Sequence, residues 1–432
     1  MNFKATLLTI FLVATGIAAC APKEEGQAPA VFTPGAYDHL SAEEKVVMAN
    51  VLVDEAEEKL RLETLEDAYG RLSEAVHLDK ENHRAQFWKH MLQPYLDMKG
   101  IVARARPLYL KANQGQARYM ALLDSIERRN DPTYRRYLLQ GPNDIETDEQ
   151  FREWMDKTIV SLNEFRLWIK NNKDRELELN APSDLFGSLL AKRCERSIRS
   201  SVRADRPAVC QPGRMIAFKM NRADFEIVSS LVSMYTLQLA LFYAYRTNPL
   251  LLFESDQKRN SQEYIAFLLG EQSGDLRAVH KLGLGIELSK DWAVASRHIV
   301  QAQAEFCPKG LQYQSRRPKG YLFSSTFCWI AHDKDNTEKN LTVLDAIVAG
   351  EPIAFTGEKG TELTLNISGF IKEPMTSLVP LKPTQYDKCG NAKEFDESAF
   401  RTLITKGSLN QYIQDKEIRC ALESVSTPVV PQ

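Results

Sequence analysis

Apolar residues recur at helical spacing through most of the chain between residues 41 and 305. Ser41 is followed three residues later by Glu44, a capping-box pattern that predicts the start of a helix. Further helices are expected at about 103–128, 132–139, 148–171, 184–203, 222–246, 258–270, 276–305 and 338–349. Prolines, glycines and asparagines separate these segments, as is typical of turns. The pattern therefore predicts a mainly α-helical protein with a helical domain over residues 41–305.

The pattern changes after residue 305. Ile353–Thr356 and Glu362–Ile371 are expected to be strands, because apolar and polar residues alternate in the second of them. Gly357 and Gly360 lie in the short segment between the two, which predicts a hairpin. We expect residues 306–425 to form a small α+β cap and residues 426–432 to be a loose tail.

One helical stretch resembles a tetratricopeptide repeat. Small and apolar residues fall at helical spacing over Ala68, Leu72, Ala75 and Leu78. A short polar turn follows, and Ala85 opens a new helical run. Ala56 lies twelve residues before Ala68, where that motif has a small residue. Lys80 replaces the usual turn proline, Glu55 replaces a leucine, and only Val51–Met91 fits. The resemblance implies a degenerate tetratricopeptide-like helical array.

The N-terminus has the pattern of a secretory signal peptide. Lys4 precedes an apolar stretch over Leu7–Gly16, and Ile17-Ala18-Ala19-Cys20 follows. This order resembles a bacterial lipoprotein signal. The resemblance implies that residues 1–19 are removed, that the Cys20 thiol takes a diacylglycerol, and that the new amine is acylated, for example with palmitate. An ordinary signal peptide with an incidental cysteine is the alternative.

The lipoprotein resemblance also implies a location. Residues 20–40 would be a lipidated tether, since they are rich in proline and poor in apolar side chains. Ala21 rather than aspartate follows Cys20. By resemblance to enterobacterial sorting, this indicates the outer membrane, with the protein facing the periplasm.

Six cysteines remain in the mature chain, an even number that predicts disulfides in an exported protein. Fifteen connectivities are possible for six cysteines. We favour three pairs that are local in sequence: Cys194–Cys210, Cys307–Cys328 and Cys389–Cys420. A metal site is disfavoured, because the chain contains no CxxC motif and His332 is the one histidine within five residues of any of them.

Composition and charge narrow the class of protein. The chain is 44% hydrophobic and 26% charged, as in a globular protein, and its formal net charge is −2. A nearly neutral chain has no general attraction to nucleic acid, so we expect no nucleic-acid partner.

Ile227–Tyr245 contains no charged residue, which allows three interpretations: a core helix, an apolar ligand groove or a membrane span. A stripe of small residues at spacings of four, three and four favours a core helix that packs closely against others: Ser229, Ser233, Thr236 and Ala240.

Four arginines lie on one face of the helix expected at 184–203 and its continuation: Arg196, Arg199, Arg203 and Arg206. Arginine forks suit phosphate and carboxylate groups, so this face is a possible surface for an anion or a partner. A solvated face that pairs with acids elsewhere in the fold is the favoured alternative.

No GxSxG, HExxH or phosphate-loop pattern occurs, and the calcium-loop pattern that starts at His332 fails at Glu338 and Leu344. We therefore assign no catalytic residue, metal ligand or cofactor. Ala223-Asp224-Phe225-Glu226 and Phe242-Tyr243-Ala244-Tyr245-Arg246 resemble segments of uncharacterised helical lipoproteins from delta-proteobacteria, a resemblance that implies no known activity.

These observations favour a lipid-anchored envelope protein that binds or scaffolds a protein or an anionic envelope component. Catalytic activity is disfavoured but left open. An enzyme acting on envelope polymers and an accessory ligand-delivery lipoprotein of a periplasmic solute transporter are the alternatives.

Overall fold

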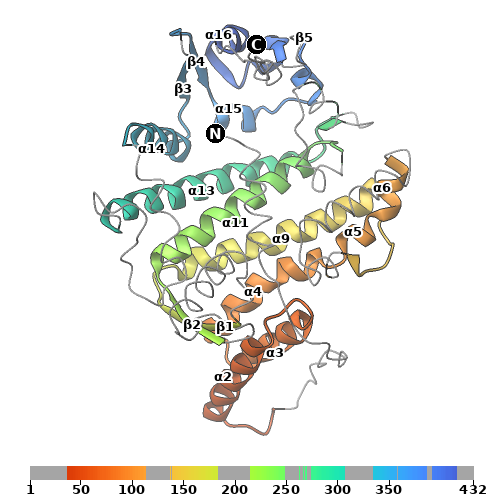
Figure 1. Ribbon diagram of the computed structural model, residues 1–432, viewed down its shortest axis with the longest axis vertical. Coiled ribbons are helices and arrows are strands. Elements are labelled where there is room, and N and C mark those ends of the chain that lie inside the picture. The colour runs from red at the N-terminus through yellow and green to blue at the C-terminus, as the bar shows by residue number, and fades with distance from the viewer. Residues whose placement is uncertain are drawn as a thin grey trace, which may run out of the picture. The chain divides into compact units, whose positions relative to one another are not determined.

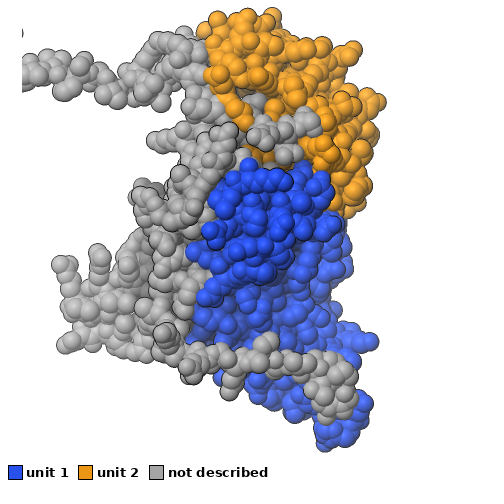
Figure 2. Space-filling model, turned by 90° about the vertical axis from the view of Figure 1, so that its right-hand side faces the viewer, with its two compact units in different colours: residues 1–236, 295–337 blue, residues 237–294, 338–432 orange. Residues whose placement is uncertain are grey.

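The computed structural model describes residues 37–112, 137, 139–182, 215–248, 262, 266, 268–269, 274–306, 334–357, 359–386 and 392–415. Helices account for 64% of the described residues, with a few small sheets, which confirms the predicted mainly α class. The chain divides into two compact units, coloured separately in Figure 2. Unit 1 comprises residues 1–236 and 295–337, and unit 2 comprises residues 237–294 and 338–432.

Unit 1 begins with three consecutive helices, α2 (Ala42–Glu58), α3 (Leu65–Leu78) and α4 (His83–Met98). The predicted capping box at the start of α2 is confirmed. The Glu44 backbone N–H donates to Ser41 Oγ at 3.3 Å, and the Ser41 N–H donates to Glu44 Oε2 at 2.8 Å. The short helices α5 (Ile101–Arg104) and α6 (Arg106–Ala112) follow, and then the long helix α9 (Asp148–Asn172), which starts with a second capping box at Thr147.

The three N-terminal helices pack in sequence, α2 against α3 and α3 against α4, and α4 also packs against α9 (Figure 1). Alanines that the sequence pattern placed at helix contacts have no exposed surface: Ala56, Ala68, Ala75 and Ala85. A methyl side chain lets two helix backbones approach closely, whereas a longer one would hold them apart. The small residues therefore set the spacing of this stack.

Aromatic rings fill the space between α4, α9 and α11 (Arg222–Ala244). The Phe87 ring centroid lies 5.9 Å from that of Phe165, 5.8 Å from that of Trp168 and 6.2 Å from that of Phe225. Edge-on and tilted aromatic pairs at such distances contribute about 0.5–1.5 kcal/mol each beyond the area they bury. The rings thus join three helices that are far apart in sequence.

Unit 1 also contains an antiparallel pair of strands that the sequence analysis did not predict. Leu177 in β1 (Leu177–Pro182) is paired with Met220 in β2 (Met215–Met220), and the register runs on to Pro182 opposite Met215. Buried Leu177 and Leu179 alternate with exposed Glu178, the period of a strand. Asparagine and proline between the helices expected at 148–171 and 184–203 had indicated a turn, but Pro182 lies at a strand end, where proline is tolerated.

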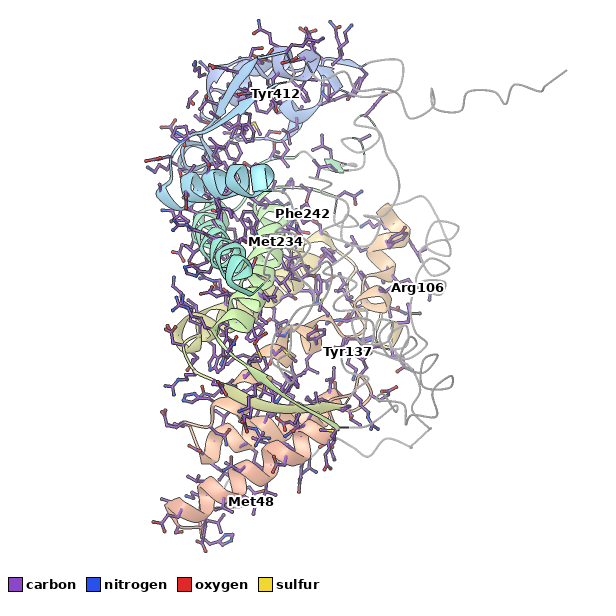
Figure 3. All side chains as sticks on the ribbon, turned by 60° about the vertical axis from the view of Figure 1, so that its left-hand side comes forward. Met48, Arg106, Tyr137, Met234, Phe242 and Tyr412 are labelled. Atoms are coloured by element: carbon purple, nitrogen blue, oxygen red, sulfur yellow. The ribbon has the colours of Figure 1, made fainter. Side chains whose placement is uncertain are left out.

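Helices α11 and α13 (Val279–Phe306) lie close to the segments predicted at 222–246 and 276–305, and both cross the division between the units. Within the described residues, Asp224–Ala244 is the one helical stretch long and apolar enough to cross a membrane. Ser233, Thr236 and Ala240 of its small-residue stripe are fully buried, however, and the Ser230 and Ser296 hydroxyl oxygens lie 3.0 Å apart across the two helices. This burial favours the core-helix interpretation. Figure 3 labels two further side chains of α11, Met234 and Phe242.

The described part of unit 2 contains α14 (Lys334–Ala349), the greater part of which belongs to this unit, and a three-stranded antiparallel sheet in the order β3-β4-β7. Its strands are β3 (Ile353–Thr356), β4 (Glu362–Leu365) and β7 (Ile404–Gly407), so the predicted hairpin is confirmed. The prediction that the second strand continues to Ile371 is wrong. Asn366 Oδ1 accepts a hydrogen bond from the Gly369 N–H at 2.8 Å, which ends the strand and caps α15 (Ile367–Lys372).

Shorter elements complete unit 2: the 3-10 turns Val379–Leu381 and Glu397–Phe400, the paired strands β5 (Gln385–Tyr386) and β6 (Ala392–Glu394), and α16 (Leu409–Asp415). A small apolar core joins Ala244 and Tyr245 to Leu282 and Ile371. The Tyr245 hydroxyl donates to the Met375 carbonyl at 3.2 Å, and burial raises the pKa of Tyr245 to about 12.

The turn between β3 and β4 is held by a carboxylate from the end of α16. Asp415 accepts hydrogen bonds from the Lys359 N–H at 2.6 Å and the Thr361 N–H at 3.1 Å. A Cβ atom at Gly357 would lie only 2.0 Å from Asp415 Oδ2, so a larger residue there would displace the Asp415 carboxylate. Burial alone would raise the pKa of Asp415, but the hydrogen bonds from Thr361 and Lys359 outweigh it and hold the pKa below its ordinary value.

We expect Asp415→Asn to lower the melting temperature of the protein at pH 7 and to have a smaller effect in acid. The folded-state pKa of Asp415 is depressed, so its stabilisation is present above the unfolded-state pKa and is lost as the pH falls through the folded-state value. Circular dichroism melts of wild type and variant between pH 7 and about pH 2.5 test this. The exposed Glu351→Gln variant is the control, and a melting difference that stays constant over this pH range would contradict the assignment.

Candidate functional site

Two buried carboxylates organise the charged side chains of unit 1. Glu57 and Glu226 expose only 1% and 4% of their surface. Taking a carboxylate out of water costs several kcal/mol unless hydrogen bonds and opposite charges replace the water. The partners of each carboxylate therefore indicate what it does.

Glu57, near the end of α2, is paired on both oxygens. Its Oε1 accepts a hydrogen bond from Trp88 Nε1 at 2.8 Å, and its Oε2 accepts from Arg84 Nη2 at 2.6 Å and from Asn180 Nδ2 at 3.0 Å. Burial alone would lower the pKa of Arg84, but contact with Glu57 and Asp54 raises it above the ordinary value. The donors come from α4 and β1, so this cluster joins three elements and is structural.

Glu226, in the first turns of α11, gathers basic side chains from two other segments. Its Oε1 lies 2.9 Å from His298 Nδ1 in α13 and 3.2 Å from Lys173 Nζ, just after the end of α9. Arg222 Nε lies 3.9 Å away, one helical turn before Glu226, and its Nη1 also contacts Asp174 at 3.2 Å. The carboxylate is buried, but 33% of the His298 side chain and 26% of the Lys173 side chain are exposed.

The Glu226–His298 pair has the geometry of a carboxylate that orients an imidazole. Holding Nδ1 against the carboxylate fixes the orientation of the ring and leaves Nε2 as the nitrogen for a catalytic contact. Such a pair can act as a general base. In the described part of the chain, no hydroxyl or thiol is hydrogen-bonded to this ring, so the pair alone does not form a nucleophilic site.

A third buried carboxylate, Asp97, connects α4 to α9. Its Oδ1 lies 3.1 Å from Lys157 Nζ and accepts a hydrogen bond from Gln93 Nε2 at 3.0 Å. The Asp97 carbonyl accepts from Trp154 Nε1 at 2.6 Å. Asp97 thus fixes α4 to α9 with its carboxylate and its backbone carbonyl, whereas the indole at Glu57 bonds to the carboxylate itself.

The site residues predicted from sequence fall outside the described residues. These are the lipidation site Cys20, the six cysteines Cys194, Cys210, Cys307, Cys328, Cys389 and Cys420, and the arginine face Arg196, Arg199, Arg203 and Arg206. Over the ranges that the structure describes, no group of three or more His, Cys, Asp or Glu side chains could hold a metal ion.

The two carboxylate clusters were missed by the sequence analysis. Their members are 27 to 123 residues apart for Glu57 and up to 72 apart for Glu226, so no local motif contains them. One signal was available in the sequence. Glu57 directly follows the small residue Ala56 and lies on the same side of the helix as the buried residues Ala49 and Val53. A charge on an apolar face indicates a buried partner.

Comparisons with known proteins found no match: no family model, no curated protein and no solved structure corresponds to this chain.

We expect Glu57→Ala to destabilise the protein by about 1–3 kcal/mol, because it leaves the buried Trp88 indole N–H and the Asn180 amide without their acceptor, while Arg84 keeps its contact with Asp54. The adjacent exposed substitution Glu58→Ala is the matched control and should change the free energy of unfolding by less than about 0.5 kcal/mol. Urea unfolding measures both. Equal effects of the two substitutions would show that the Glu57 cluster does not hold the stack.

We expect Glu226 and His298 to be coupled by about 0.5–3 kcal/mol in a double-mutant cycle of Glu226→Gln and His298→Ala. The exposed ion pair between Glu178 and Lys219 is the control cycle and should give a smaller coupling. Urea unfolding of the four proteins in each cycle measures the coupling. Additive effects of the first pair would mean that the contact contributes nothing to the folded state.

Proposed function

We propose that this protein is a lipid-anchored binding or scaffold protein of the bacterial cell envelope, which presents the surface of its helices to a protein or an anionic envelope component. The observation that carries the proposal is the fixed stack of α2, α3 and α4, spaced by buried alanines and joined to β1 through Glu57. A surface that is rigid before binding loses little conformational entropy on binding. Stacked helices of this kind present extended surfaces to peptides and proteins.

The anchor is part of the proposal. Ile17-Ala18-Ala19-Cys20 supports cleavage before Cys20 and lipidation of its thiol. The sixteen residues 21–36 could span at most about 53–58 Å when fully extended, enough to hold the folded units away from a membrane. The absence of aspartate after Cys20 supports the outer membrane, with the protein facing the periplasm.

The finer features of the fold belong to the same proposal. We infer that α2, α3 and α4 are a degenerate tetratricopeptide-like unit, since small residues occupy the expected contact positions. We also infer that three disulfides, Cys194–Cys210, Cys307–Cys328 and Cys389–Cys420, stabilise the exported chain, and that Arg196, Arg199, Arg203 and Arg206 offer a surface for an anionic component.

An enzyme acting on envelope polymers is the second candidate, and one observation favours it. His298 is oriented by the buried carboxylate of Glu226 and remains partly exposed. A general base of this kind would need a nucleophile or a water positioned by the substrate.

We expect Cys20→Ser to release the protein from membranes or to leave its signal peptide uncut. The lipid chains supply the attachment, at about 0.8 kcal/mol for each buried CH₂ group. Membrane flotation and N-terminal mass spectrometry of the wild type and the variant measure this. A serine variant that stays membrane-bound after cleavage at the same place would contradict the anchor.

Wild-type cells that express a tagged form of the protein test the binding function. After cross-linking in intact cells, a scaffold should co-purify with a defined partner in a fixed ratio, and His298→Ala should not change that ratio. An enzyme should instead release products from isolated envelope polymers, and His298→Ala should abolish the release. The absence of any cross-linked partner, together with such hydrolysis, would replace the scaffold proposal with the enzyme.

A further inference from the structure

The outward side of α2 carries an apolar patch. On its inner side, α2 buries Ala49, Leu52, Val53 and Ala56. On the opposite side, two valines are exposed, Val47 by 64% and Val51 by 44%. The helix is the one that carries the Met48 label in Figure 3. Helical stacks normally end with a polar outer face, because nothing follows to cover an apolar one.

Acidic residues border these valines along the helix. Val47 and Val51 are one helical turn apart, Glu43 lies one turn before Val47, and Glu58 lies two turns after Val51. We call Glu43, Val47, Val51 and Glu58 the α2 outer face. All four residues are exposed.

The charge of α2 is strongly negative. Its sequence contains six acidic residues and one lysine. Two nearby arginines are already bonded, Arg71 to Glu55 and Arg84 to Asp54 and Glu57. The acidic charge at the two ends of the α2 outer face therefore stays directed to solvent.

We propose that the α2 outer face docks an amphipathic segment of a partner protein, whose apolar side chains cover Val47 and Val51 and whose lysines or arginines lie against Glu43 and Glu58. The inference rests on the proposed binding function and names one of its surfaces. Burial of the valines favours docking, and charge complementarity selects a basic segment.

Charge also argues against two other occupants. An anionic lipid surface would be repelled by this acidic helix. A second copy of the chain would place two α2 helices with like charges face to face, which is unfavourable across an interface.

The first experiment uses a synthetic peptide as the probe. We would label an 18-residue helical peptide with a leucine stripe bordered by lysines, and measure its fluorescence anisotropy with residues 20–432 carrying Cys20→Ser. A matched peptide with glutamate in place of lysine tests the charge requirement.

We expect the lysine peptide to bind more tightly than the glutamate peptide and to weaken with added salt. The double variant Val47→Gln/Val51→Gln should weaken binding by about tenfold or more, and Glu43→Gln/Glu58→Gln by about three- to tenfold. Val279→Gln, at a 56%-exposed valine of α13, is the matched control and should change binding less than about twofold. Circular dichroism melts verify that each variant folds.

The inference would be overturned if the lysine peptide did not bind at about 1 mM, or if Val279→Gln weakened peptide binding as much as the double valine variant does. It would also be overturned if the protein bound phosphatidylglycerol vesicles more tightly than the peptide and the double valine variant abolished that binding. A dimer detected by sedimentation that the valine variant abolishes would also overturn it, in favour of a second copy. In cells, a cross-linked partner retained by Val47→Gln/Val51→Gln would refute this surface but leave the proposed function standing. If the wild-type protein cross-linked to no partner at all, both this surface and the proposed binding function would be refuted.

Discussion

The pairing of the buried Glu57 carboxylate is the constraint on which unit 1 depends. The Glu57 carboxylate exposes 1% of its surface and both of its oxygens are bonded, by Arg84 and Trp88 of α4 and by Asn180 of β1. None of these donors can move without leaving a charge or a polar group unpaired. The cost of an unmet hydrogen bond therefore fixes the register of α2, α4 and β1 more strictly than apolar packing, which tolerates shifts of similar volume.

A carboxylate bonded to several donors also occurs in unit 2, where it stabilises a different kind of structure. Asp415 accepts backbone N–H groups from Lys359 and Thr361, so that a side chain near the end of the described chain closes a turn more than fifty residues earlier. In unit 1 a carboxylate joins whole helices, whereas in unit 2 it organises a loop. Glu226 differs from both because it holds an imidazole, that of His298, whose side chain is 33% exposed.

Helices with a clear period were predictable from the sequence, because burial of one face imposes the pattern directly. The start of α2 at Ser41 and the bounds of β3 followed from local chemistry. The errors also have local causes. Ile367 continued the alternation of β4, but the Asn366 side chain capped a helix instead, and a proline at the end of β1 suggested a turn. The carboxylate clusters could not be predicted, because Glu57 meets Asn180 and Glu226 meets His298 only after folding brings distant segments together.

The position of Glu57 within α2 has a mechanical consequence. Any pull on the chain before Ser41 enters unit 1 at the first turn of α2, whereas the Glu57 hydrogen bonds lie sixteen residues further on, about 24 Å along the helix axis at 1.5 Å per residue. The load would therefore peel the early turns of α2 away one after another before it reached the charged cluster. The segment before α4 would be loaded first, where Asn82 donates to Asn50, then α4 itself through Arg84 and Asp54, and the hydrogen bond from Asn180 of β1 to Glu57 would be loaded after both.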